Sequence, residues 1–101
     1  EESIKDINTM YEKVMKTYEM SLQSMREGSS ELALKVVKME EQVDIIERSC
    51  RSAHIYRLNN SMCNPEAGII FLDLLSNLER ISDHASNIAK AVIDAKGSIS
   101  A

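Results

Sequence analysis

The sequence predicts an all-α protein that folds as an antiparallel up-down-up bundle of three helices. Two observations predict this class. The 101 residues include only three Gly, one Pro and no Trp, whereas strong helix formers such as Leu, Ala, Glu and Lys are abundant. Apolar residues also recur at alternating three- and four-residue steps, the period of an amphipathic helix. Long helices with short connections between them lie antiparallel to their neighbours.

The first helix is expected at about residues 4–26. Its expected core stripe consists of Ile4, Ile7, Tyr11, Val14, Tyr18 and Met25. The stretch EGSS at 27–30 then supplies a glycine stop and a serine cap, Ser29 or Ser30. Glu31 follows in the first turn of the next helix, where a negative charge is favourable.

The second and third helices are expected at about residues 30–59 and 65–95. Asn64 is placed to cap the third helix, with Pro65 at its first position, and GSISA forms a frayed tail. The expected core of the second helix is Leu32, Val36, Met39, Val43, Ile46, Cys50 and Ala53. That of the third is Phe71, Leu74, Leu78, Ile81, Ala85, Ile88 and Val92.

Composition limits the domain organisation and the partners. The chain, residues 1–101, is long enough for one three-helix domain, and its Glu-Glu start suggests a piece of a larger membrane transporter. A net charge of -4 disfavours nucleic acid as a partner. No apolar run reaches the roughly 18 residues that cross a bilayer, so this segment is not expected to insert. Cys50 and Cys63 lack metal or redox spacing and suggest reduced thiols in the cytoplasm.

Two acidic motifs of the form Glu-x-x-x-Asp are the candidate site. Glu40 and Asp44 carry the motif in the second helix, and Glu79 and Asp83 carry it in the third. Glu47 and Asn87 continue these rows as weaker candidates. Carboxylates four apart share a helix face and repel, so two facing pairs favour a cation. Oxygen donors suit Mg²⁺, Ca²⁺, Mn²⁺ or iron. The alternative is a solvated, metal-free face.

Part of the sequence resembles a known family. EEQVDIIER in the second helix, NPEAGIIFLDLLSNLERISDHASNIA in the third, and the loop between them are similar to the PhoU family. The similarity is greatest to the PhoU-like cytoplasmic domain of bacterial sodium-dependent phosphate cotransporters. The resemblance implies a regulator of phosphate transport that binds a multinuclear iron or zinc cluster through Glu40, Asp44, Glu79 and Asp83. A full PhoU protein has two three-helix repeats, whereas this chain has one.

Catalysis is not expected. The chain has no Glu-x-x-His pair, no glycine-rich phosphate loop and no nucleophile with a base partner. His84 points about 100° away from Asp83 and is not expected to share its ion, and His54 is expected at an interface. A metal-dependent enzyme is the least favoured hypothesis.

The leading hypothesis is therefore a non-catalytic, metal-binding regulatory domain of a sodium-dependent phosphate transporter. The expected partner is the transmembrane region of that transporter, and the expected location is the cytoplasmic side of a bacterial inner membrane. The alternatives are a metal-free helical interaction module and half of a soluble PhoU-type regulator. A homodimer is expected, because thin bundles expose apolar flanks. The flank residues considered are Val37, Ile45, Ile69, Ile70 and Leu75.

Overall fold

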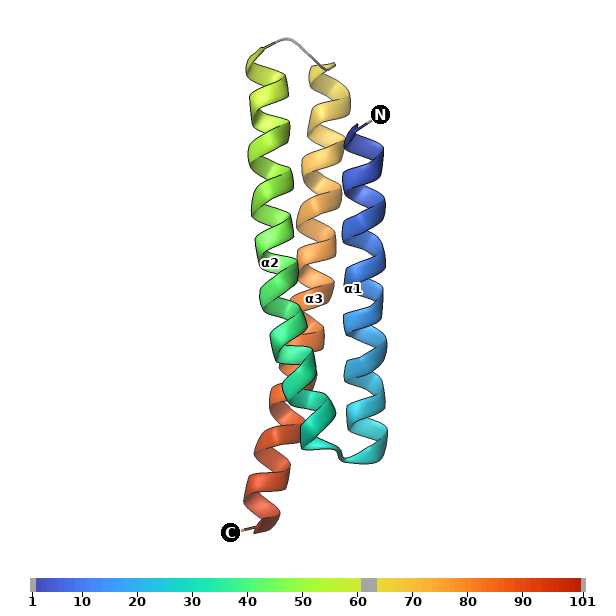
Figure 1. The fold of residues 1–101 in the computed structure, drawn as a ribbon, viewed down its shortest axis with the longest axis vertical. Coiled ribbons are helices and arrows are strands. Elements are labelled where there is room, and N and C mark those ends of the chain that lie inside the picture. The colour runs from blue at the N-terminus through green and yellow to red at the C-terminus, as the bar shows by residue number, and fades with distance from the viewer. Residues whose placement is uncertain (1, 61–63, 101) are drawn as a thin grey trace.

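The protein is a three-helix bundle in a computed structural model that describes residues 2–60 and 64–100 (Figure 1). Helix α1 spans Glu2–Glu27, α2 spans Ser30–Asn59 and α3 spans Pro65–Ser100. Helices α1 and α3 run in the same direction and α2 runs against them, which confirms the predicted up-down-up topology. The bundle measures 57 × 18 × 16 Å. None of the helices described has both the length and the hydropathy that crossing a membrane requires.

The helix boundaries follow from the turn residues that the sequence analysis identified. Gly28 adopts a positive φ of 61°, and the Ser29 hydroxyl accepts a 3.2 Å hydrogen bond from the Leu32 amide. The Asn64 side chain accepts a 2.8 Å bond from the Glu66 amide, with Pro65 as the first helical residue. Helix α3 continues to Ser100, so the expected end near Ala95 is wrong, because one glycine costs a helix only about 1 kcal/mol.

The buried side of α1 differs from the expected stripe. Val14 is buried as expected and Ile7 and Tyr18 are half-buried, but Ile4, Tyr11 and Met25 are exposed. The side that faces the bundle carries smaller and partly polar residues, namely Met10, Val14, Thr17, Ser21 and Ser24. The three hydroxyls among them donate to carbonyl oxygens of the same helix, so their burial leaves no donor unpaired. Both sides of α1 satisfy a three-four period, and periodicity alone did not choose between them.

The cores of α2 and α3 are closer to the prediction but shifted at several positions. Val36, Val43 and Cys50 are buried as expected, whereas Leu32, Met39, Ile46 and Ala53 are half-buried. Ala33, Glu47 and His54 are buried instead of their neighbours Leu32, Ile46 and Ala53. On α3, Leu74 was expected inside and Leu75 outside, but Leu74 is 43% exposed and Leu75 is fully buried. Ile81 and Ile88 are half-buried.

His54 is a core residue near the α2–α3 connection. It is 2% exposed and stacks on Phe71 with ring centroids 4.1 Å apart. Gly68 makes this approach possible, because a Cβ there would lie 3.0 Å from His54 Nε2 and 2.8 Å from Leu58 Cδ2. Burial lowers the pKa of His54, which favours the neutral ring. The Cys50 thiol is buried and free, and Cys63 lies outside the described residues.

A pair of leucine substitutions tests the corrected core. Leu75→Ala removes a fully buried side chain, and we expect it to lower the free energy of unfolding by about 2 to 5 kcal/mol. The matched control Leu34→Ala removes a side chain that is mostly exposed on α2, and we expect a loss below about 1 kcal/mol. Urea denaturation followed by circular dichroism measures both. Equal losses would contradict the assigned core.

Candidate metal centre

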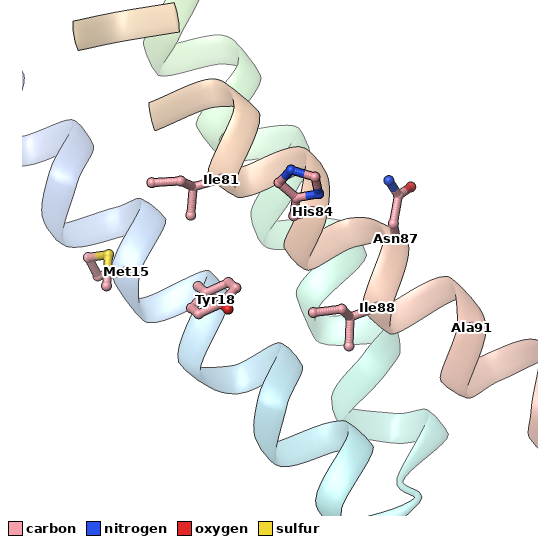
Figure 2. A pocket seen from close by; sticks show the side chains of 7 residues that line it. All are labelled: Met15, Tyr18, Ile81, His84, Asn87, Ile88 and Ala91. Atoms are coloured by element: carbon pink, nitrogen blue, oxygen red, sulfur yellow. The ribbon is translucent and has the colours of Figure 1, made fainter. Parts of the chain in front are cut away.

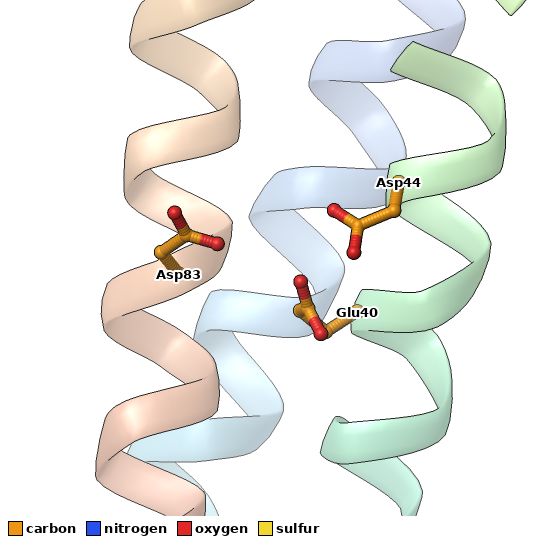
Figure 3. Close-up of side chains that lie close together, drawn as sticks. All are labelled: Glu40, Asp44 and Asp83. Carbon is orange, nitrogen blue, oxygen red and sulfur yellow. The ribbon is translucent and has the colours of Figure 1, made fainter. Parts of the chain in front are cut away.

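Three carboxylates converge on the surface that α2 and α3 share. Glu40 and Asp44 lie one turn apart on the side of α2 that faces α3, and Asp83 points toward them from α3 (Figure 3). One oxygen from each side chain lies within 4.8 Å of the others. The antiparallel course of α2 and α3 produces this meeting, because it places the middle of one helix beside the middle of the other.

The remaining candidates lie outside this carboxylate group. Glu79 is half-buried and lies one turn before Asp83 on α3. Glu47 is buried and accepts a 2.6 Å hydrogen bond from Arg51 Nε. Arg51 Nη2 also donates to Ser76 Oγ on α3 at 3.4 Å, so Glu47 serves the packing of α2 on α3. The structure therefore separates Glu47, a weaker candidate, from the group.

Asn87 and His84 belong to a different surface. Both line a groove between α1 and α3, and His84 is not part of the three-carboxylate group. This placement agrees with the prediction that His84 points away from the acidic row. Asn87, the other weaker candidate, lies one turn after Asp83 and lines this groove.

Negative charge is crowded along this surface. The pKa of Glu40 is raised from about 4.5 to about 7, mainly by burial, then by a hydrogen bond to Asp44 and the charges of Asp44 and Asp83. Lys90 opposes this rise. The pKa of Glu79 is also raised, first by burial and then by the charge of Glu47, with smaller contributions from Asp83 and Asp44. A proton therefore occupies a position among carboxylates that a cation could take instead.

The donor set fits a hard cation. Carboxylate oxygens are the ligands that Mg²⁺, Ca²⁺, Mn²⁺ and iron prefer. Glu40 and Asp44 are half-buried and Asp83 is exposed, so one side of the group is open to water or to an anion. Three carboxylates from two helices would hold such an ion by neutralising charges that otherwise repel.

One family of known proteins matches most of this chain. The profile of the PhoU domain family matches residues 7–92. The chain is also similar to the phosphate-specific transport system accessory protein PhoU homolog 1 of Thermotoga maritima, with 24% identity over 92 residues. That match covers 91% of this chain and 40% of the relative. No solved structure matches the chain significantly.

The raised pKa of Glu40 generates a prediction about pH. The folded protein holds this proton more tightly than the unfolded chain, so the stability it contributes is present below about pH 4.5 and is lost as pH rises through about 7. In the presence of a chelator we expect Glu40→Gln to abolish a decline of about 1 to 2 kcal/mol across this window, allowing for solvent screening.

Urea unfolding at intervals from about pH 5 to 8 measures this difference. The control is Glu41→Gln, an exposed neighbour on α2 that lies outside the carboxylate group. The control should keep the parent's pH dependence. Parallel curves for the parent and Glu40→Gln would show that Glu40 does not titrate as the geometry requires.

Proposed function

Because the chain belongs to the PhoU domain family, we propose that it is a non-catalytic regulatory unit of phosphate transport whose carboxylate group binds metal ions. The family match over residues 7–92 is the observation that carries the regulatory part. The metal part is supported by the convergence of Glu40, Asp44 and Asp83 from two helices. The proposed ions are divalent or trivalent, and a multinuclear iron or zinc cluster is included.

The similarity to the Thermotoga maritima protein favours a PhoU-type regulator over a domain fused to a sodium-dependent cotransporter. It is named as an accessory protein of a phosphate-specific transport system, and this chain spans 40% of its length. We therefore propose that the chain supplies one three-helix unit of a PhoU-type regulator. Its proposed partner is the membrane-embedded part of a phosphate transporter, met on the cytoplasmic side. Fusion to a sodium-dependent cotransporter is less well supported, and the sequence upstream of Glu1 in the gene would test it.

The proposed metal has a direct energetic role. In the absence of an ion, burial raises the pKa of Glu40, and repulsion from Asp44 and Asp83 raises it further. A bound cation would replace this repulsion with attraction and so would hold α2 and α3 together along this surface. Burial raises the pKa of Glu79, and the charges of Glu47, Asp83 and Asp44 add to this rise, so Glu79 is the side chain available to extend the site to a second ion.

The rival function is a metal-free helical interaction module. In that case the acidic surface is only solvated, as charged helix faces usually are. The two functions differ in what a conservative loss of one carboxylate does. If the surface binds metal, loss of one carboxylate lowers the affinity for the metal ion. If the surface is only solvated, the same loss has no effect that depends on metal.

Substitution of single ligands should move stability and metal binding in opposite directions. We expect Asp44→Asn and Asp83→Asn each to leave the metal-free melting temperature unchanged or slightly raised, because each relieves like-charge repulsion. We expect each to abolish the rise in melting temperature that Mn²⁺ or Fe³⁺ gives the parent. Glu41→Gln, an exposed carboxylate on α2 outside the group, is the matched control and should keep the full shift.

Calorimetry with and without metal measures these shifts, and elemental analysis of protein purified without chelators identifies the ion. A parent that carries no ion and shows no metal-dependent shift would decide for the metal-free module. A shift that survives both ligand substitutions would place the metal elsewhere.

A test in cells addresses regulation itself. We expect deletion of the gene in its own host to alter phosphate uptake, and the parent gene to restore it. The Asp83→Asn variant should accumulate to the same level yet fail to restore uptake, because it lacks a metal ligand. Uptake of radiolabelled phosphate measures the result, with Glu41→Gln as the control. Normal uptake without the gene would contradict a role in phosphate transport.

A further inference from the structure

A groove of about 700 Å³ runs between α1 and α3, on a different side of the bundle from the carboxylate group. Figure 2 shows Met15 and Tyr18 of α1 on one side of it and Ile81 and Ile88 of α3 on the other. His84 and Asn87 of α3 also line it. The groove is lined mainly by apolar side chains and is open to solvent. Exposed apolar patches of this kind are uncommon on monomeric proteins and often mark an interaction site.

The groove lies within a longer apolar face that has coiled-coil spacing. On α1 this face follows alternating steps of three and four through Tyr11, Met15, Tyr18, Leu22 and Met25. On α3 it repeats every seven residues through Leu74, Ile81 and Ile88. Among the described residues, ten large apolar side chains are exposed, and five of them lie on these rows or their continuations, namely Ile4, Tyr11, Met25, Ile70 and Leu74.

We propose that this α1–α3 face is the contact with a second copy of the chain, in a parallel homodimer. Helix α1 of one copy lies over α3 of the other, and the twofold axis runs along the bundle. This inference does not depend on the proposed function, because the metal ligands lie between α2 and α3.

Charges along the two edges of the face select this arrangement. On α1, the residues that precede Tyr11, Tyr18 and Met25 are buried, so the residues that follow them project from the outer edge. This edge carries Lys5, Glu12, Glu19 and Arg26, all exposed and seven apart. On α3, the residues that follow Leu74 and Ile81 are buried, so those that precede them project outward. That edge carries Asp73, Arg80, Asn87 and Asp94, also exposed and seven apart.

A twofold axis along the bundle joins these edges at equal heights. Met15 and Tyr18 line the groove together with Ile81, His84 and Ile88, so α1 residues lie level with α3 residues about 63 to 73 positions later. At a separation of 68, Lys5 meets Asp73 of the partner subunit, Glu12 meets Arg80 of the partner subunit, and Arg26 meets Asp94 of the partner subunit. Each of these three pairs joins opposite charges.

The antiparallel alternative brings like charges together. If α1 packed on α1 about its centre, Lys5 would meet Arg26 and Glu12 would meet Glu19. Charge complementarity therefore favours the parallel form. Helix α1 has 26 residues, about 39 Å of helix at about 1.5 Å per residue, so an interface of the usual size, about 800 Å² per partner, would use most of its length.

Sedimentation equilibrium of the full 101-residue chain tests the face. We expect the parent to be a dimer at tens of micromolar. Tyr11→Glu, at a side chain that is 52% exposed, should give a monomer with the parent's helical circular dichroism. The matched control Ile45→Glu changes a side chain that is 62% exposed on α2, and it should stay dimeric. A monomeric parent, or equal disruption by both variants, would overturn the proposal.

Charge reversal tests the parallel register separately from folding. Glu12→Arg and Arg80→Glu should each raise the dimer Kd about tenfold, because each places like charges together at both edges. The double variant should return close to the parent value. A double variant no better than either single one would overturn the pairing. Tighter association of Glu12→Arg alone would indicate the antiparallel form, where that residue meets Glu19 of the partner subunit.

Discussion

The structure depends on the packing of α3 against both of the other helices. Its buried side runs through Phe71, Leu75, Leu78, Ala85 and Ala89. Because these residues face the bundle axis, helical geometry places their neighbours in sequence on the two flanks of α3. Asp83 then lies on the flank shared with α2, and Ile81 and Ile88 lie on the flank shared with α1. The carboxylate group and the apolar groove are both consequences of this one orientation.

Small residues determine how closely the helices approach in the half of the bundle near the α1–α2 turn. Ala33, Ala85 and Ala89 form part of one core cluster, and Ser82 and Ser86 are buried beside them on α3. This packing brings acidic residues of α2 and α3 together even though their charges repel. The positive charges of Arg51 and Lys90 partly oppose the rise in the pKa of Glu79 and Glu40 respectively, so each of these two carboxylates has a cation nearby.

Much of the fold could be predicted from single residues with one structural role. Gly28, Ser29, Asn64 and Pro65 marked the helix boundaries because their preferences act locally. The candidate site was predictable only in part. Both acidic motifs were visible, but the relative height of α2 and α3 decides that Asp83 completes the group and Glu79 does not. Glu47 accepts a hydrogen bond from Arg51 and lies outside the carboxylate group. These outcomes depend on tertiary contacts that spacing along one helix does not contain.

The two sides of α1 show why the fold is better understood as part of an assembly. A lone bundle gains most by burying its largest apolar side chains, at about 25 cal/mol per Å². Helix α1 instead buries Thr17, Ser21 and Ser24 and leaves Tyr11 and Met25 exposed. Its small inner side permits close approach to α2 and α3, and its large outer side gains stability only when another surface covers it. Tyr11, Tyr18 and Met25, which were expected in the core, therefore belong to the row that defines the proposed contact.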